Sequence, residues 1–373
     1  MTEIGNIWKN NERYIKLLSL IGRLSRLFAE SEIPFLQYRV PENLFCKCLD
    51  AKNLSREDIA YDAILNQIGV GIKTFQLPNK SSNEKVAEFN RLAKNLVDLS
   101  NKDLAQTVAT YRNNRINTAN NLYGIQDQLY HIVGRRKNQF VIFDAPYELI
   151  DIDNIHGVKE REGGISFTDG KAEYNFNRSK SVLYQRFHIS DNHLEVPVEI
   201  IEDPYMLLEQ LLNEETAQLA QQPIQIKDYV ILPLFSNRNG GIVPLKSGLN
   251  QWNAGGRKRD RDEVYVPIPK KLHLLHPDFF PSRDIPFNLI LPNGDIISAK
   301  ICQDNEKALM SNPNKALGKW LLRDIMKIPY GQLVTMEDLE RLGFNSLMLK
   351  KVNDTTYNIS ISRIESYRDF ITK

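Results

Sequence analysis

An aspartate and a lysine in the first quarter of the chain are residue types that metal-dependent hydrolysis of phosphodiester bonds requires. Asp62 opens a short apolar segment, Tyr61–Leu65, and Lys73 lies within a second one, Ile68–Phe75. Carboxylates can hold magnesium, and a lysine beside the attacked phosphate can orient water and offset developing charge. Asp62 is therefore the first candidate metal ligand, and Lys73 is the candidate for positioning the nucleophile.

A second carboxylate has to come from outside this pair of segments. The residue two positions before Lys73 is Gly71, which offers no acid. Glu42 follows Pro41 in the first turn of a predicted short helix and is the favoured second metal ligand. Glu88, in a helix expected after the two segments, is the reserve catalytic candidate. An aspartate and a lysine at this spacing also occur in proteins without such chemistry, so the spacing alone leaves both interpretations open.

Apolar periodicity predicts the elements that would position these residues. It predicts an amphipathic helix from Tyr14 to Phe28, and a hairpin of Tyr61–Leu65 and Ile68–Phe75 joined by a tight turn. Residues 84–131 are expected to be mainly helical, and a further helix is expected from Tyr205 to Leu219. The remaining predicted strands of this mixed α and β part are Phe140–Phe143, Glu148–Ile152 and Lys180–Phe187.

A change of pattern near residue 222 predicts two domains, 1–222 and 223–373. After it, short apolar runs alternate with Gly, Pro and Asn turns, which predicts a mainly β, barrel-like domain with Gly318–Met326 as its clearest helix. The fold class is therefore α/β (α+β), followed by a β pseudo-barrel. The strands predicted there are Tyr229–Leu232, Val264–Pro267, Phe287–Leu291, Ile296–Ile301 and Thr356–Ile361.

Composition narrows the classes of partner. The formal net charge is +2, so any nucleic-acid surface has to be local. The 3 cysteines are too few for a disulfide framework or a four-ligand zinc site, which favours an intracellular protein. No apolar run approaches membrane-spanning length, so we expect no membrane role.

Two polar segments interrupt the β pattern, and we call them the first arm (247–261) and the second arm (303–319). They are rich in Asn, Gln and Arg, which make paired hydrogen bonds to base edges, and in Lys and Ser, which mostly hold phosphates. Both could equally be solvated loops of a β domain.

From Trp252 to Arg323 the sequence resembles the B3-like DNA-recognition domain of several restriction endonucleases. The matching segments include Trp252–Arg257, Asp262–Pro269, Phe279–Pro281 and Cys302–Asp324. The resemblance implies a seven-stranded pseudo-barrel whose two arms contact the major groove of double-stranded DNA. The DNA-binding candidates are Asn250, Trp252, Asn253, Arg257, Lys258, Arg259, Arg261, Asn305, Ser311, Asn312, Asn314, Lys315 and Lys319; Trp320, beside Leu321 and Leu322, is expected in the core.

The N-terminal part is similar to the PD-(D/E)xK nucleases, which present an aspartate on one strand of a hairpin and an acid-x-lysine triplet on the other. The resemblance implies a type II restriction endonuclease that uses Mg²⁺ in the cytoplasm of a prokaryote and works with a DNA methyltransferase of the same system. Because cutting both strands usually requires two active sites, we also expect a homodimer. Related enzymes with a phospholipase-D-like domain carry His-x-Lys, which none of the 6 histidines begins.

Two other functions stay open. The chain could be a non-catalytic DNA-binding regulator, or a nuclease that needs a partner subunit or a second DNA site. A third set of polar residues either lines DNA in the first domain or forms a solvated face. These residues are Arg112, Asn113, Arg115, Tyr130, His131, Arg135 and Arg136.

Overall fold

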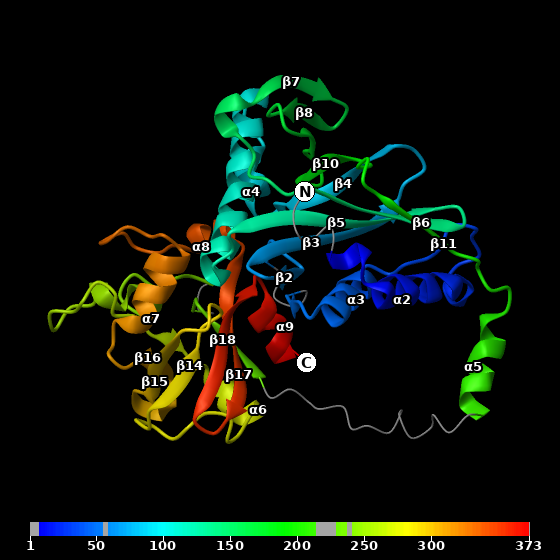
Figure 1. The fold of residues 1–373 in the computed structure, drawn as a ribbon. Helices are drawn as coiled ribbons and strands as arrows, with labels where there is room; N and C mark the ends of the chain where they lie inside the picture. The colour runs from blue at the N-terminus through cyan, green and yellow to red at the C-terminus, as the bar shows by residue number, and fades with distance from the viewer. Residues whose placement is uncertain (1–6, 55–58, 214–228, 237–240, 373) are drawn as a thin grey trace. The chain divides into compact units, whose positions relative to one another are not determined.

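The structure, a computed structural model, describes residues 7–54, 59–213, 229–236 and 241–372 (Figure 1). Contacts between Cα atoms divide the chain into two compact units, which are described separately. The first comprises Met1–Arg56, Ala60–Asn113 and Gln126–Gln225, and the second Glu57–Ile59, Asn114–Ile125 and Ile226–Lys373. The predicted boundary at residue 222 lies outside the described residues.

A six-stranded sheet forms the centre of the first unit, in the order β1-β2-β3-β5-β6-β11. Strands β3 and β5 are parallel, whereas the other neighbours are antiparallel. The strands are β1 (Lys52–Asn53), β2 (Ala63–Leu65), β3 (Ile68–Gln76), β5 (Asp127–Arg136), β6 (Gln139–Pro146) and β11 (Leu194–Pro197).

Helices α2 (Glu12–Arg23) and α3 (Arg39–Leu49) pack against this sheet. Apolar side chains of α2 and α3 meet Val70 and Ile72 of β3 in one buried cluster. The predicted amphipathic helix is confirmed up to Arg23, after which a 3₁₀ turn, Ser25–Leu27, follows. The predicted short helix is also confirmed, and Glu42 lies in its first turn.

The predicted hairpin is confirmed as β2 and β3. Its two turn residues, Asn66 and Gln67, have φ values of 50° and 63°. Such left-handed conformations match the twist of paired strands and are adopted most readily by asparagine among residues with a side chain.

A second, five-stranded sheet follows the order β4-β10-β9-β8-β7. It comprises β4 (Ser81–Glu88), β7 (His156–Arg161), β8 (Gly164–Thr168), β9 (Glu173–Asn177) and β10 (Val182–His188). Helix α4 (Asn101–Tyr123) packs its Leu104 and Val108 on this sheet. The mainly helical prediction for 84–131 is therefore wrong at both ends, because β4 pairs with β10 and Asp127–Arg136 forms β5 between β3 and β6.

The strand predicted at Glu148–Ile152 is absent. Asn113 of α4 exchanges two hydrogen bonds with the backbone of Ile150, at 2.8 and 2.9 Å, and Arg112 donates to the carbonyl of Glu148 at 2.7 Å. Side chains of α4 thus satisfy the backbone groups that a neighbouring strand would have bound.

The second unit contains a seven-stranded sheet in the order β12-β17-β18-β14-β15-β16-β13. Because the terminal strands β12 and β13 also contact each other, the sheet is a nearly closed barrel, which confirms the predicted architecture. Figure 1 shows β14, β15 and β16 side by side, next to the long β17–β18 pair. The strands are β12 (Tyr229–Pro233), β13 (Val266–Pro267), β14 (Phe287–Ile290), β15 (Ile296–Cys302), β16 (Ala308–Ser311), β17 (Phe344–Asn353) and β18 (Thr356–Arg363).

Short helices complete the two units. The second unit holds α6 (Lys270–Leu275), α7 (Ala316–Gly318) continued by a π-helix (Lys319–Ile325), α8 (Met336–Leu342) and α9 (Ser366–Thr372). In the first unit, α5 (Pro204–Asn213) begins where a helix was predicted, and the predicted remainder to Leu219 lies outside the described residues. Among the helices that are described, none has the length and apolar character needed to cross a membrane.

Candidate functional site

The β2–β3 hairpin fixes the position of Asp62, the residue directly before strand β2. The Asp62 amide donates to the carbonyl of Val70 at 2.9 Å, and the Ile72 amide donates to Asp62 Oδ2 at 2.7 Å. The carboxylate is therefore held against β3 by a backbone hydrogen bond, in one orientation.

Glu42 of α3 lies within electrostatic reach of Asp62. Its side chain is only 6% exposed, and Arg39 Nη1 pairs with Glu42 Oε2 at 3.1 Å. Burial, followed by the negative charge of Asp62, raises the pKa of Glu42 to about 7, although Arg39 and Lys73 act in the opposite direction. The same two acids contribute to raising the pKa of Cys46, one helical turn after Glu42, to about 12, where burial is the main cause. Asp62 thus faces the side of α3 that carries Glu42 and Cys46.

Lys73 brings a positive charge within electrostatic reach of Glu42. It lies on β3, half-buried, and its Nζ is 6.0 Å from the centre of the Tyr130 ring. Of the four predicted catalytic residues, Asp62 and Lys73 therefore both lie within electrostatic reach of a third, Glu42.

These side chains fit a magnesium ion that is completed by water and phosphate oxygens. Two carboxylates that repel each other, one of them buried, are the donors that Mg²⁺ prefers, and one or two protein carboxylates are usual for it. No group of three or more His, Cys, Asp or Glu side chains suited to a metal occurs in the described part of the chain.

Gly71 occupies the position where the acid of an acid-x-lysine triplet would stand. A Cβ atom on Gly71 would lie 2.8 Å from the Tyr147 ring and 2.9 Å from the Tyr130 ring. These two rings are stacked with centroids 3.9 Å apart, so neither can move aside alone. The missing acid therefore has a steric cause, since any side chain at position 71 collides with the tyrosine stack.

Replacing Gly71 by alanine is expected to destabilise the protein by about 1–3 kcal/mol, the usual cost of overpacking a core. Urea unfolding measures this change. The control is Gly255→Ala, because a Cβ atom on Gly255 would meet no atom within 4 Å and its φ is not positive. Gly124 is also in open space, but its φ of 64° would strain any other residue. Equal stability of the Gly71→Ala variant and the wild type would contradict the steric explanation.

Glu42 is expected to make stability depend on pH. Its raised pKa means that the folded state retains a proton that the unfolded state loses near the ordinary value of 4.5. The contribution of Glu42 to the free energy of unfolding is therefore fully present below pH 4.5. It is lost as the pH rises to about 7, and the total loss is about 3 kcal/mol. Unfolding of wild type and Glu42→Gln at pH 5 and pH 8 measures this difference, and the same pH dependence in both proteins would contradict it.

Glu88 lies elsewhere and in a different element than predicted. It ends strand β4, pairs with Lys85 at 2.9 Å and accepts a hydrogen bond from Asn90. The helical prediction failed because β4 is held by its pairing with β10, which outweighs local propensity.

Several residues predicted to line DNA in the first domain are buried instead. Arg112, Asn113, Tyr130 and His131 are between 0% and 9% exposed. His131 Nδ1 pairs with Asp144 at 2.9 Å and its Nε2 with the Tyr14 hydroxyl at 2.8 Å, which ties α2 to the sheet. Arg136 donates to the carbonyls of Leu77 and Asn79. Arg112, Asn113, Tyr130 and His131 are therefore structural residues whose side chains have no surface to offer DNA.

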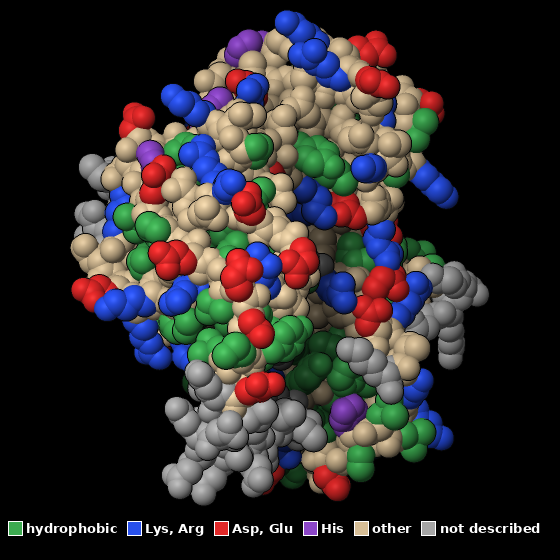
Figure 2. Space-filling model, turned by 90° about the vertical axis from the view of Figure 1, so that its right-hand side faces the viewer, with side chains coloured by type: hydrophobic (Ala, Val, Ile, Leu, Met, Phe, Trp, Pro, Cys, Tyr) green, Lys and Arg blue, Asp and Glu red, His purple; other side chains and the backbone are tan. Residues whose placement is uncertain are grey.

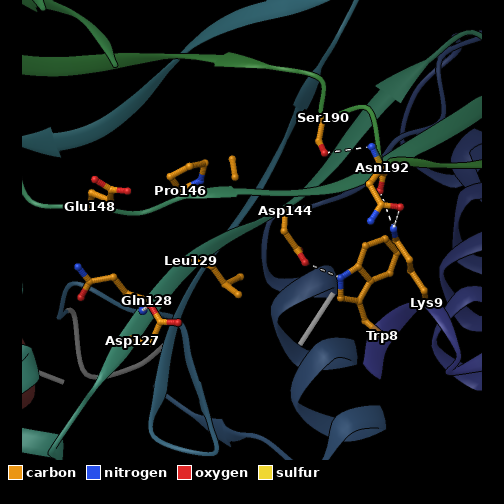
Figure 3. Close-up of a pocket in the computed structure, with 11 residues that line it drawn as sticks. Trp8, Lys9, Asp127, Gln128, Leu129, Asp144, Pro146, Glu148, Ser190 and Asn192 are labelled. Atoms are coloured by element: carbon orange, nitrogen blue, oxygen red, sulfur yellow. Dashed lines mark hydrogen bonds between the residues drawn. The ribbon is translucent and has the colours of Figure 1, made fainter. Parts of the chain in front are cut away.

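A cavity of about 370 Å³ is lined by Asp144, the partner of His131, together with Trp8 and Lys9 (Figure 3). Trp8 Nε1 donates to Asp144 at 2.8 Å, and Lys9 Nζ binds the carbonyl of Asn192 at 2.6 Å. Glu42, Asp62 and Lys73 do not line this cavity, so it is separate from the candidate catalytic residues.

In the second unit, the fold uses two of the predicted base-reading residues for its own hydrogen bonds. Asn250 is fully buried, donates to the carbonyls of Pro244 and Val334, and accepts from the Val334 amide at 2.9 Å. Ser311 is also fully buried and accepts from the Leu317 amide at 2.8 Å. Both predictions are corrected, because neither side chain has a surface to offer a base.

The rest of the first arm is anchored on buried acids. Glu263, whose side chain is 5% exposed, pairs with Arg257 and Arg259. Arg259 also donates to the carbonyl of Ala254 at 2.7 Å and is itself only 13% exposed. Arg257 keeps 54% of its side chain exposed, so its guanidinium is both held and accessible. Trp252 is half-buried, while Asn253, Lys258 and Arg261 are exposed.

The second arm meets the end of the first. Strand β13 pairs with β16 through Val266 and Leu309, and a Cβ on Gly318 would lie 1.9 Å from the Asp262 carbonyl, which explains the glycine there. Asp262 also pairs with Arg323 at 2.6 Å. The exposed candidates of this arm are Asn305, Asn312, Asn314, Lys315 and Lys319, while Trp320 is in the core as predicted.

Positive and negative side chains alternate on the face of the protein that Figure 2 draws. On the face drawn in Figure 2, Lys and Arg side chains are interspersed with Asp and Glu. A nucleic-acid surface on this protein therefore depends on particular residues, as the small net charge predicted.

Three polar residues that are important in the structure were not predicted from the sequence. These are Glu84, Glu263 and Arg323, of which the last two hold the first arm. The spacing of Glu263 from Arg259, four residues, was a usable signal, whereas the pairing of Arg323 with Asp262 depends on the closed sheet.

Comparison with known families agrees with this geometry. Residues 225–353 match the family described as the NgoFVII C-terminal B3-like DNA-binding domain. No curated protein matches the chain. The second unit is thus similar to the DNA-binding domain at the C-terminal end of a restriction enzyme, which supports double-stranded DNA as the partner.

Proposed function

We propose that the chain is a type II restriction endonuclease in which the first unit hydrolyses the DNA backbone and the second selects a short sequence. The observation that carries the proposal is that Glu42 of α3 lies within electrostatic reach of both Asp62 and Lys73, with Asp62 held by a backbone hydrogen bond to β3. The similarity of the second unit to a restriction-enzyme domain supplies the substrate class.

In the proposed reaction, each of the three residues has one role. Asp62 and Glu42 would hold Mg²⁺, which when bound would supply charge stabilisation and water activation. Lys73 would orient the nucleophile and offset negative charge that develops on the phosphate. Because Glu42 must be ionised to bind a cation, its pKa of about 7 predicts that magnesium affinity rises up to that pH.

Incubating plasmid DNA with the protein and Mg²⁺ tests the proposal. Discrete fragments support an endonuclease, whereas intact plasmid across metals and salt concentrations contradicts it and favours the non-catalytic regulator. Adding an oligonucleotide that carries the recognition site restores cutting if the enzyme needs a second DNA copy.

The proposed reaction also bears on the oligomeric state of the protein and on its cellular setting. Cutting both strands usually takes two active sites, so we propose a homodimer. We also propose that the enzyme acts in a prokaryotic cytoplasm and that a DNA methyltransferase of the same system protects the host sequence.

A further inference from the structure

The side of β3 that carries Lys73 faces the second sheet of the first unit. Phe187 of β10 lies 6.1 Å from Phe75 and 5.0 Å from Tyr130, measured between ring centres. Phe75 is two residues after Lys73 on β3, so the two side chains share one face of the strand. The face of the second sheet that carries Phe187 is therefore the one that looks toward Lys73.

Glu84 lies on that same face of the second sheet. In the β4–β10 pairing Phe187 is opposite Ser82 and Gln185 is opposite Glu84. Directly opposed residues, and residues two apart, project to one side of a sheet. Ser82 Oγ donates to Glu84 Oε1 at 2.6 Å, and Asn83 and Lys85, on the other side, are exposed. Glu84 thus points inward, toward β3.

The charges agree with this placement. Burial raises the pKa of Glu84, while its Ser82 hydrogen bond and the positive charges of Lys73 and Arg135 lower it. Lys73 acts in the same direction on Glu42. The lysine therefore lies within the field of one carboxylate from α3 and another from β4.

We propose that Glu84, on strand β4 of the second sheet, is a positioning residue for Lys73 and replaces the acid that position 71 cannot carry. Gly71 has no room for a side chain beneath the tyrosine stack, so no acid can steady Lys73 from within β3. A lysine has a flexible stem, and a second charged partner restricts where its ammonium rests. This inference rests on the proposed nuclease function, in which Lys73 orients the nucleophile.

Replacing Glu84 by glutamine removes the charge and keeps the shape. We expect plasmid cleavage to fall by about 10–100-fold, the usual cost of losing a partner that orients a site residue, with duplex binding unchanged. The matched control is Glu173→Gln in the same sheet, whose carboxylate forms an exposed pair with Arg186 and should be dispensable. In a Lys73→Met background, Glu84→Gln should cause no further loss. A wild-type rate for Glu84→Gln, or an equal loss in both backgrounds, would overturn the proposal.

A chemical readout separates this proposal from the nuclease activity. Reductive methylation followed by peptide mass spectrometry reports how readily Lys73 reacts in the full chain. Without its carboxylate partner the Lys73 side chain should be less restrained, and it should react about twofold faster or more. Unchanged labelling in Glu84→Gln would overturn the role of Glu84 even if the enzyme cuts DNA. Changed labelling in a protein that never cuts would leave Glu84 as the partner of Lys73 and refute only the nuclease.

Discussion

Replacing Asp62 by asparagine is expected to slow plasmid cleavage by more than about a hundredfold, since losing even an outer partner of a metal ligand costs 10–100-fold. Asparagine keeps an oxygen that can accept the hydrogen bond from the Ile72 amide, so the hairpin should stay intact. Only the negative charge that would hold Mg²⁺ is removed. Specific duplex binding, measured by mobility shift, should be unchanged because the DNA-reading candidates lie in the second unit.

Asp127→Asn is the control for this variant. Asp127 belongs to the same sheet as Asp62, and its Oδ1 accepts only a local hydrogen bond from the Gln128 amide among the contacts described. This variant should cut at the wild-type rate. If Asp62→Asn also cuts at that rate, Asp62 is not a metal ligand and the catalytic assignment is wrong.

Replacing Arg323 by methionine is expected to destabilise the protein by about 3–5 kcal/mol, the cost of leaving a buried charge unpaired. Arg323 is 12% exposed and its partner Asp262 7% exposed, with 2.6 Å between Nε and Oδ1. The guanidinium also donates to the carbonyls of Ile328 and Arg261, and so ties the end of the first arm to the π-helix. Specific DNA binding should weaken together with stability.

Urea unfolding measures this loss, and two further variants establish its cause. Arg341→Met breaks a more accessible pair, in which Arg341 is 33% and Asp338 15% exposed, and should cost at most about 1 kcal/mol. Asp262→Asn combined with Arg323→Met should be more stable than Arg323→Met alone, because no unpaired charge is left. A loss in Arg323→Met no larger than that in Arg341→Met would show that the buried pair does not hold the arm.

Local patterns predicted the elements around the candidate catalytic residues well. The alternation on either side of Asn66 and Gln67 identified the hairpin, and Pro41 correctly placed Glu42 in the first turn of α3. Both depend on residues close in sequence, for which periodicity and turn preference are sufficient information. The meeting of Glu42 with Asp62 could only be a hypothesis, since it requires α3 to pack on the sheet.

Long-range pairing determined the features that the sequence did not reveal. Strand β4 contains Lys85 and Glu88, which favour helices over strands, and its pairing with β10 overrides that preference. Asn250 has the chemistry of a base-reading residue, yet Val334, far along the chain, uses its amide for the fold. Residue type therefore predicts what a side chain can do, whereas burial decides whether DNA can reach it.

Cleavage of a random-sequence duplex library tests directly whether the protein recognises a short DNA sequence and cuts near it. Duplexes are first selected on the protein without divalent metal, then supplied with Mg²⁺, and the new ends are sequenced. We expect one enriched short motif in the bound pool and new ends at a fixed distance from it, and we expect these ends to disappear in Asp62→Asn. An enriched motif without new ends would contradict the nuclease and leave a sequence-specific DNA-binding protein.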